Sequence, residues 1–216
     1  MQARLYSPEL AKEIAADLLE IGAIKLQPEN PFTWASGWQS PIYCDNRLSL
    51  SFPMVRTKIK DAFCEIIKNE FPETQGIVGV ATAGLPQGAI IADQLELPFL
   101  YVRSKSKSHG LENQIEGHLP KGQKVVVVED LVSTGGSSIK AVEAIRAAGG
   151  EVLGMISIFT YGFEQAEKNL EASNLKLVHL SDYSTLIDNA LSDGSIKQEQ
   201  KELLDNWRRS PETWSI

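Results

Sequence analysis

The chain has 216 residues, of which 43% are hydrophobic and 23% are charged, and its formal net charge at pH 7 is −7. This size and composition are typical of a globular protein with a sizeable core. The acidic balance argues against nucleic-acid binding, which needs a basic surface. Because no apolar stretch reaches membrane-spanning length and no signal peptide is evident, we expect a cytoplasmic protein that binds no membrane.

The sequence contains no internal repeat, low-complexity tract or linker, so we expect one domain over residues 1–216. Its two cysteines, Cys44 and Cys64, are expected to be reduced thiols. No His or Cys set has the spacing of a zinc site, and we predict no dedicated protein metal centre.

The N-terminal segment predicts a helix over residues 7–21. Ser7 followed by Pro8 is a typical helix start, apolar residues recur at helical spacing, and Gly22 is a typical stop.

Residues 23–47 are rich in aromatic, Pro, Gly and Ser residues and predict a small β hood, a lobe of the same domain. The expected strands lie near 24–26, 32–34 and 42–44. The aromatic side chains of Trp34, Trp38 and Tyr43 suit either a core or stacking on a flat ring, and the sequence leaves both possibilities open.

Strands and helices then alternate. The predicted elements are a helix at 52–70, a strand at 76–81, a helix at 87–95 and a strand at 98–102. The turn after the first of these strands contains Gly84, which could bring backbone N–H groups close to a diphosphate.

A basic segment follows. Arg103, Lys105, Lys107 and His109 recur at every second position, so an extended chain would place them on one side. The segment is either a solvated basic loop or a mobile arm that binds a diphosphate.

Residues 125–138 read VVVVEDLVSTGGSS, and the rest of the chain is organised around them. The valine run predicts a strand buried on both faces. Two acids, Glu129 and Asp130, come next, then a turn of small residues and a helix over 139–148. A strand that ends in acids and a small-residue loop predicts a binding site at the end of that strand.

Each part of this stretch has a chemical use. Gly135 and Gly136 allow backbone N–H groups to approach a phosphate at a helix start. Ser133, Thr134 and Ser137 add hydroxyl donors. The acids would repel a phosphate but suit the vicinal hydroxyls of a sugar, so the stretch predicts a ribose 5-phosphate site.

The rest of the chain predicts a strand at 151–160, a helix at 161–172, a strand at 175–180 and a helix at 198–207. Alternating strands and helices predict an α/β fold with a central parallel sheet flanked by helices. Ligands then bind beyond the carboxyl ends of the strands.

The central stretch closely resembles the signature by which type I phosphoribosyltransferases bind 5-phosphoribosyl 1-diphosphate (PRPP), and the resemblance implies their fold with an N-terminal hood. It implies that the acids hold the ribose hydroxyls and the loop holds the 5-phosphate. The residues implied to bind PRPP are Glu129, Asp130, Leu131, Val132, Ser133, Thr134, Gly135, Gly136 and Ser137, together with Arg103, Lys105, Lys107 and His109 of the basic segment.

The hood sequence FTWASGWQSPIYCDNR resembles the orotate phosphoribosyltransferases. Many of these have lysines where this chain has Ala35 and Ser104, and some have an orotate-binding arginine where FTYGF stands here. Lys105 could replace the lysine missing at Ser104. The implied orotate contacts are Ser133 and Arg47.

The resemblance implies transfer of the 5-phosphoribosyl group from PRPP to orotate, with Arg103, Lys107 and His109 as catalytic residues. It implies Mg²⁺ held mainly through PRPP, and a homodimer in which the loop 103–117 reaches the neighbouring active site. Two alternatives stay open: a phosphoribosyltransferase for another base, and a non-catalytic PRPP sensor.

Overall fold

The computed structural model describes residues 3–34, 37–103 and 114–214. Its centre is a seven-stranded sheet in the order β1-β11-β10-β9-β6-β7-β8, in which only the β7–β8 pair is antiparallel. The strands are β1 (Ala3–Leu5), β6 (Gly76–Val80), β7 (Phe99–Val102), β8 (Ile115–Glu116), β9 (Lys124–Val132), β10 (Glu151–Thr160) and β11 (Leu177–Asp182).

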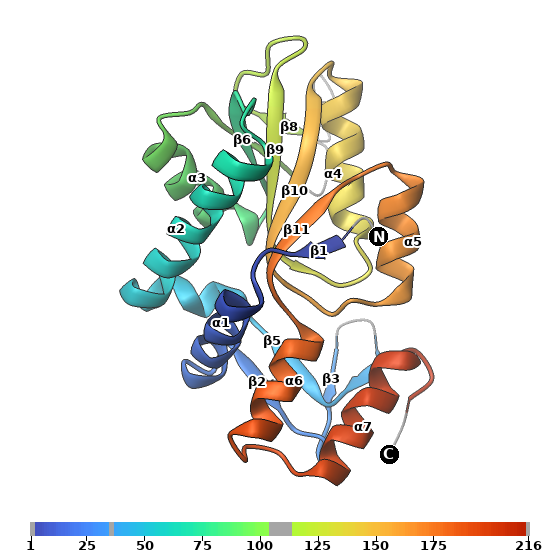
Figure 1. The fold of residues 1–216 in the computed structure, drawn as a ribbon. Coiled ribbons are helices and arrows are strands. Elements are labelled where there is room, and N and C mark those ends of the chain that lie inside the picture. The colour runs from blue at the N-terminus through green and yellow to red at the C-terminus, as the bar shows by residue number, and fades with distance from the viewer. Residues whose placement is uncertain (1–2, 35–36, 104–113, 215–216) are drawn as a thin grey trace.

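Helices cover both faces of the sheet (Figure 1). One face carries α1 (Pro8–Glu20), α2 (Pro53–Glu70) and α3 (Gly84–Leu95), and the other carries α4 (Gly136–Ala147) and α5 (Glu164–Ala172). The predicted α/β fold with a central parallel sheet between helices is confirmed. Within the described part of the chain, no helix has the length and apolar character needed to cross a membrane.

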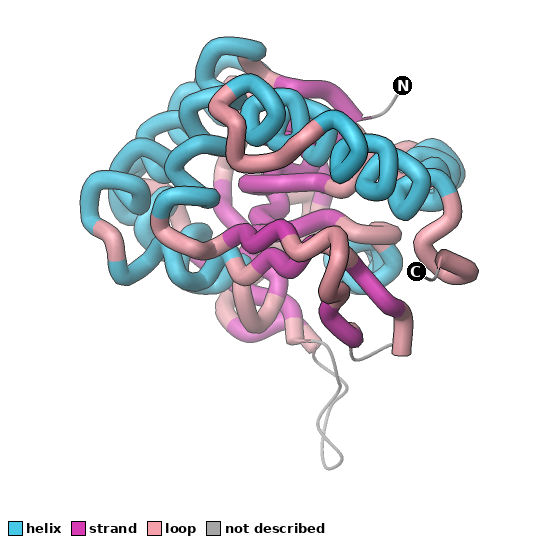
Figure 2. The backbone as a smooth tube through the Cα atoms, turned by 90° about the horizontal axis from the view of Figure 1, so that it is seen from below, coloured by secondary structure: helices cyan, strands magenta, loops and turns pink. Residues whose placement is uncertain are grey.

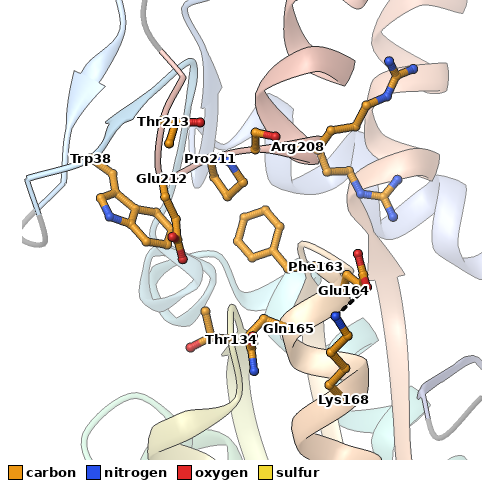
Figure 3. Close-up of a pocket in the computed structure, with 12 residues that line it drawn as sticks. Trp38, Thr134, Phe163, Glu164, Gln165, Lys168, Arg208, Pro211, Glu212 and Thr213 are labelled. Atoms are coloured by element: carbon orange, nitrogen blue, oxygen red, sulfur yellow. Dashed lines mark ion pairs between the residues drawn. The ribbon is translucent and has the colours of Figure 1, made fainter.

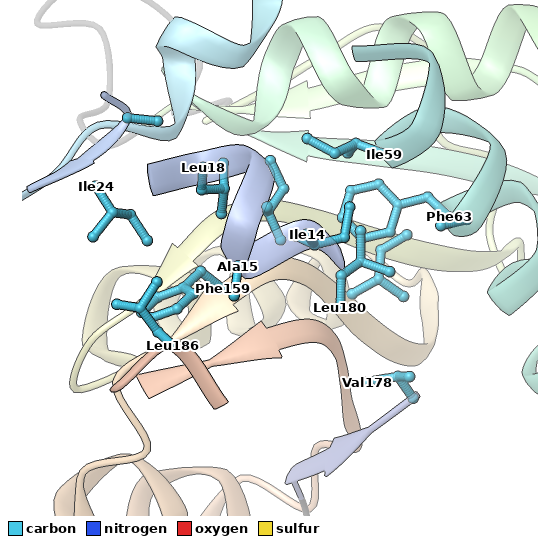
Figure 4. Close-up of a cluster of buried hydrophobic side chains, with 14 of the residues drawn as sticks. Ile14, Ala15, Leu18, Ile24, Ile59, Phe63, Phe159, Val178, Leu180 and Leu186 are labelled. Atoms are coloured by element: carbon cyan, nitrogen blue, oxygen red, sulfur yellow. The ribbon is translucent and has the colours of Figure 1, made fainter. Parts of the chain in front are cut away.

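Strand β9 shows why the valine run is uninterrupted. Val126 and Val128 pack into the cluster beneath α1, α2 and α3, whereas Val125 and Val127 pack into the cluster beneath α4 and α5. Successive strand residues point to opposite faces, so both faces need apolar side chains. Figure 4 shows the first cluster, in which Ile14 and Phe63 are fully buried.

The hood consists of two small antiparallel sheets (Figure 2). The predicted hood strands are present, and a fourth, short strand accompanies them. The pairs are β2 (Ile24–Leu26) with β5 (Ile42–Cys44), and β3 (Phe32–Thr33) with β4 (Gln39–Ser40). A 3₁₀ helix, η1 (Asn46–Ser51), follows.

The C-terminal helices α6 (Tyr183–Ser192) and α7 (Gln198–Arg209) complete this lobe. Trp207 of α7 is fully buried, and its ring lies 5.6 Å from that of Trp34. Its Nε1 donates a hydrogen bond to the carbonyl oxygen of Gln39 at 3.1 Å. The helix predicted over 198–207 is present and packs on the hood through Trp207.

Two boundaries near the acid pair differ from the prediction. Strand β9 continues through both acids to Val132, because β10 pairs with it as far as Thr160. Helix α4 begins at Gly136 rather than at residue 139, and Gly135 precedes it with a φ of +79°. The unpredicted strands β1 and β8 have three and two residues, too few for a pattern in sequence.

Candidate active site

The connection between β9 and α4 lies at the carboxyl edge of the sheet and is the centre of the site. Gly135 adopts the left-handed backbone that glycine accepts without strain, and Gly136 starts the helix. The first N–H groups of α4 therefore have no partner within the helix and can bind an anion. Ser137 is exposed in this first turn.

The two acids have different surroundings. Glu129 is 6% exposed, and its carboxylate accepts hydrogen bonds from the hydroxyl of Ser138 at 2.8 Å and from the backbone N–H of Asp130 at 3.3 Å. Asp130 is half-buried, and its carbonyl oxygen accepts a bond from Nδ2 of Asn46 at 2.8 Å. Asp130 is therefore the more accessible of the two acids.

Burial and the neighbouring Asp130 carboxylate raise the pKa of Glu129 to about 8. Burial also raises the pKa of Asp130, although hydrogen bonds from the backbone of Leu131 and Asp130 oppose that shift. The surroundings of the acid pair are therefore short of positive charge and suit a ligand that brings a cation or several hydroxyl donors.

Replacing Glu129 with Gln should change how stability depends on pH. The unfolded chain loses the proton of this acid near its ordinary pKa of 4.5, whereas the folded protein keeps it until about pH 8. Ionisation of Glu129 therefore lowers the free energy of unfolding as the pH rises through this window. Urea denaturation from pH 5 to 8 should show the variant gaining stability relative to the original chain. If the free energy of unfolding depended on pH equally in the two proteins, the raised pKa of Glu129 would be contradicted.

One side of the loop opens into a cavity of about 310 Å³, which we call the hydroxyl cavity. Most of its lining residues are aromatic or carry hydroxyl groups, and they come from the hood, from the end of β9 and from the residue after β10. The lining residues are Thr33, Trp34, Tyr43, Cys44, Leu131, Ser133 and Tyr161. Flat walls with a few polar groups suit a small planar ring.

The other side opens into a cavity of about 240 Å³, which we call the cationic cavity. Arg103 and Lys140 line it, together with Ala81, Gln114 and Ser137. The guanidinium of Arg103 forms an ion pair with the carboxylate of Glu116 at 3.2 Å, and this contact holds the arginine side chain. Two cations beside a helix start suit a phosphate-containing group.

Close packing of the segment after β6 against strand β9 forms one side of the cationic cavity. A Cβ atom at Gly84 would overlap the carbonyl oxygen of Val128, so only glycine permits this contact between the turn after β6 and strand β9. The contact brings Ala81 to the edge where the acid pair lies. The role that the sequence suggested for Gly84, bringing backbone N–H groups close to a diphosphate, stays a prediction.

The other residues predicted for the site have varied positions. Arg47 lies outside both cavities and binds Asp45 through Nε at 2.6 Å and Nη2 at 2.9 Å. Val132 is buried in the core. The three remaining basic-segment positions, Lys105, Lys107 and His109, lie outside the described residues.

Thr134 lines a third cavity, of about 330 Å³, shown in Figure 3. Phe163 forms one wall, the segment after Arg208 forms another, and Lys168 pairs with Glu164 at 2.6 Å. Neither acid of the pair lines this cavity or the other two, and we assign no part of a substrate to this one.

Among residues 3–34, 37–103 and 114–214, no three His, Cys, Asp or Glu side chains are grouped to hold a metal ion. The site offers instead the adjacent acids Glu129 and Asp130. The more accessible carboxylate, that of Asp130, fits Mg²⁺, which prefers oxygen ligands and is commonly held through substrate phosphates and water.

Three residues of the site have roles that the sequence did not indicate. Asn46 bonds to the acid pair from the hood, Tyr161 lines the hydroxyl cavity, and Lys140 lines the cationic cavity. A weak signal existed for Lys140, which lies one turn into a helix that starts with a phosphate-binding pattern. Asn46 and Tyr161 are distant in sequence from the loop, and only the fold brings them close.

Comparison with known proteins agrees with this geometry. The family model for the phosphoribosyl transferase domain matches residues 53–183. An orotate phosphoribosyltransferase of Porphyromonas gingivalis is 57% identical over 207 residues, which cover 96% of this chain and 99% of the relative. One of Lactococcus lactis subsp. cremoris is 55% identical, with 95% and 98% covered.

Solved structures share the fold. The orotate phosphoribosyltransferase of Aeropyrum pernix is 32% identical, with a TM-score of 0.74 and coverage of 85% of this chain and 99% of that one. The adenine phosphoribosyltransferase of Leishmania tarentolae has a TM-score of 0.65 at 20% identity over 87% of this chain and 94% of that one, which shows only a common fold. The near-complete coverage at high identity decides the family: this chain belongs to the orotate phosphoribosyltransferases.

Proposed function

We propose that the chain transfers the 5-phosphoribosyl group from PRPP to orotate, giving orotidine 5′-monophosphate and diphosphate in pyrimidine biosynthesis. The observation that carries the proposal is the position of the loop 133–137 between two unlike cavities, with Asp130 just before it. A planar base suits one cavity, a diphosphate suits the other, and the sugar phosphate joins them. Relatives that are 55–57% identical and bear this family's name support orotate as the base.

Each part of PRPP has a proposed partner. The 5-phosphate binds the free N–H groups at the start of α4 and the hydroxyls of the loop. The ribose hydroxyls donate to Asp130. The diphosphate lies in the cationic cavity beside Arg103, with Lys140 as a further cation. Orotate enters the hydroxyl cavity, where Ser133 contacts it, and Arg47 can contribute after it leaves Asp45.

The reaction breaks the bond between the anomeric carbon of ribose and the diphosphate oxygen, and it forms a bond from that carbon to N1 of orotate, which releases its proton to water. Positive charge develops on the ribose ring while the diphosphate leaves as an anion. Arg103 stabilises the departing diphosphate, and we propose that Lys107 and His109 join it, with Lys105 in support.

We propose Mg²⁺ as the cofactor, bound mainly through PRPP, with Asp130 as the accessible protein carboxylate. When bound, the ion neutralises diphosphate charge. We also propose a homodimer in which the loop 103–117 extends to the neighbouring active site. The described residues on either side of 104–113 lie together, because the N–H of Arg103 donates to the carbonyl oxygen of Gln114 at 2.8 Å.

Loss of orotate absorbance tests the function directly. We expect loss that requires both PRPP and Mg²⁺, and none when uracil or hypoxanthine replaces orotate. Turnover of another base without orotate turnover would mean that the hydroxyl cavity is assigned to the wrong base. Binding of PRPP by calorimetry without turnover of any base would favour the sensor alternative.

A further inference from the structure

The hydroxyl cavity contains no positive charge among its described lining residues. Orotate carries a carboxylate that distinguishes it from uracil, so the cavity needs donors for that group. Arg47 is the cation that the hood sequence offers as a candidate, but its guanidinium is bound to Asp45 and its side chain is 58% exposed. The donors already present in the cavity are hydroxyl groups, those of Thr33, Ser133 and Tyr161 among them.

Tyr161 differs from the other hydroxyl residues in how firmly its ring is held. The residue is 2% exposed and contacts five aromatic rings at centroid distances of 5.3 to 6.5 Å. The rings belong to Trp34, Phe159, Phe163, Tyr183 and Trp207. Such packing leaves the ring one position, so its hydroxyl points in one direction.

Among the residues that the structure describes, no hydrogen bond joins the hydroxyl of Tyr161 to another protein group, and this oxygen is not one of the fully buried polar atoms without a partner, so it is open to the cavity. A buried tyrosine hydroxyl ordinarily finds a partner. The neighbouring Tyr183 follows that rule and donates to the carbonyl oxygen of Leu204 at 2.8 Å. Because Tyr161 lines the hydroxyl cavity, its hydroxyl is available to donate to a ligand there. Burial raises the pKa of the phenol well above its ordinary value, so it stays a donor.

The backbone of Tyr161 is held as firmly as its ring. Arg208 of α7 donates from Nε to the carbonyl oxygen of Tyr161 at 3.1 Å and from Nη2 to that of Gly162 at 3.2 Å. The N–H of Tyr161 donates to the carbonyl of Val132, the residue before Ser133, at 3.2 Å. These contacts fix Tyr161 relative to the phosphate loop.

We infer that Tyr161 recognises the base: its hydroxyl donates a hydrogen bond to the orotate carboxylate, and Arg208 is the residue that positions it. This inference rests on the proposed function, because it names a donor within that same site. In this assignment, the base is selected by a neutral hydroxyl group that rigid aromatic packing holds in position. A neutral donor costs less to bury than a cation would.

The test compares ligands that differ only by the carboxylate. Orotidine 5′-monophosphate and uridine 5′-monophosphate are titrated by calorimetry into the original chain and into Tyr161→Phe, which keeps the ring and removes the hydroxyl. We expect Tyr161→Phe to lose about 10- to 100-fold in affinity for the orotate nucleotide, as for a hydrogen bond to a charged group. Its affinity for the uracil nucleotide should change less than about threefold, since that ligand does not use the bond.

Tyr183→Phe is the matched control, because it removes a hydroxyl from the same aromatic cluster but outside the cavity. It should lower the melting temperature and leave the nucleotide preference unchanged. Arg208→Gln is a second variant that keeps Tyr161 and releases the backbone. It should reduce the preference and raise KM for orotate more than KM for PRPP.

A preference that survives in Tyr161→Phe would overturn the inference, and loss of preference only in Arg47→Gln would transfer the role to Arg47. An original chain that binds both nucleotides equally would also overturn it. If the original chain did not turn over orotate, the proposed function itself would be wrong, and the inference that rests on it would fail with it.

Discussion

Replacing Asp130 with Asn should lower kcat/KM for PRPP by roughly 10²- to 10³-fold, the loss typical of one preorganised electrostatic contact. The carboxylate is the more accessible of the acid pair and accepts charge-assisted bonds from the ribose hydroxyls in our assignment. Asn keeps the shape and one acceptor oxygen but removes the charge. Initial rates at varied PRPP and saturating orotate measure the effect.

Two further variants serve as controls for the effect of Asp130→Asn. Asp93→Asn removes an exposed acid from α3 and should leave both rate and stability unchanged. Glu129→Gln should cost less activity than Asp130→Asn, because Glu129 is buried against Ser138 and its pKa of about 8 keeps it largely protonated at neutral pH. The reverse order of the two losses would show that the buried acid, not the accessible one, holds the ribose.

Replacing Trp207 with Ala should lower the free energy of unfolding by about 3 to 5 kcal/mol, the usual cost of removing a fully buried large aromatic side chain. The variant loses ring contacts with Trp34, Tyr161, Phe163 and Tyr183, and it loses the bond to the carbonyl of Gln39. For a chain of this size, the melting temperature should fall by about 6 to 20 °C. Calorimetry or circular dichroism measures both quantities.

Trp207→Phe separates packing from the hydrogen bond. It retains much of the ring and should lose less stability than Trp207→Ala. An alanine variant with the original melting temperature would mean that α7 does not hold the hood onto the sheet. If the stability falls as expected, KM for orotate should also rise, because Trp34 and Tyr161 line the hydroxyl cavity and both contact Trp207.

The sequence by itself determined the sheet and the phosphate loop. The run Val125–Val128 has apolar side chains on both faces of a strand, so the strand must be covered by helices on both sides. Gly135 adopts a backbone conformation that few other residues accept. These are local requirements, so they can be seen in a short window of residues. For the same reason, the resemblance of this stretch to a known signature was enough to predict the family.

Only the tertiary structure decided which side chains surround the loop. Asn46 reaches Asp130 across 84 positions, and Arg208 reaches Tyr161 across 47. Neither pair lies within a periodic pattern, because these contacts depend on how the hood and α7 pack together. The structure also showed that Glu129 is more buried than Asp130. The sequence could not show this difference, because the two acids are adjacent and have the same neighbours in sequence. Burial and long-range contact are properties of packing, and packing exists only once the chain has folded.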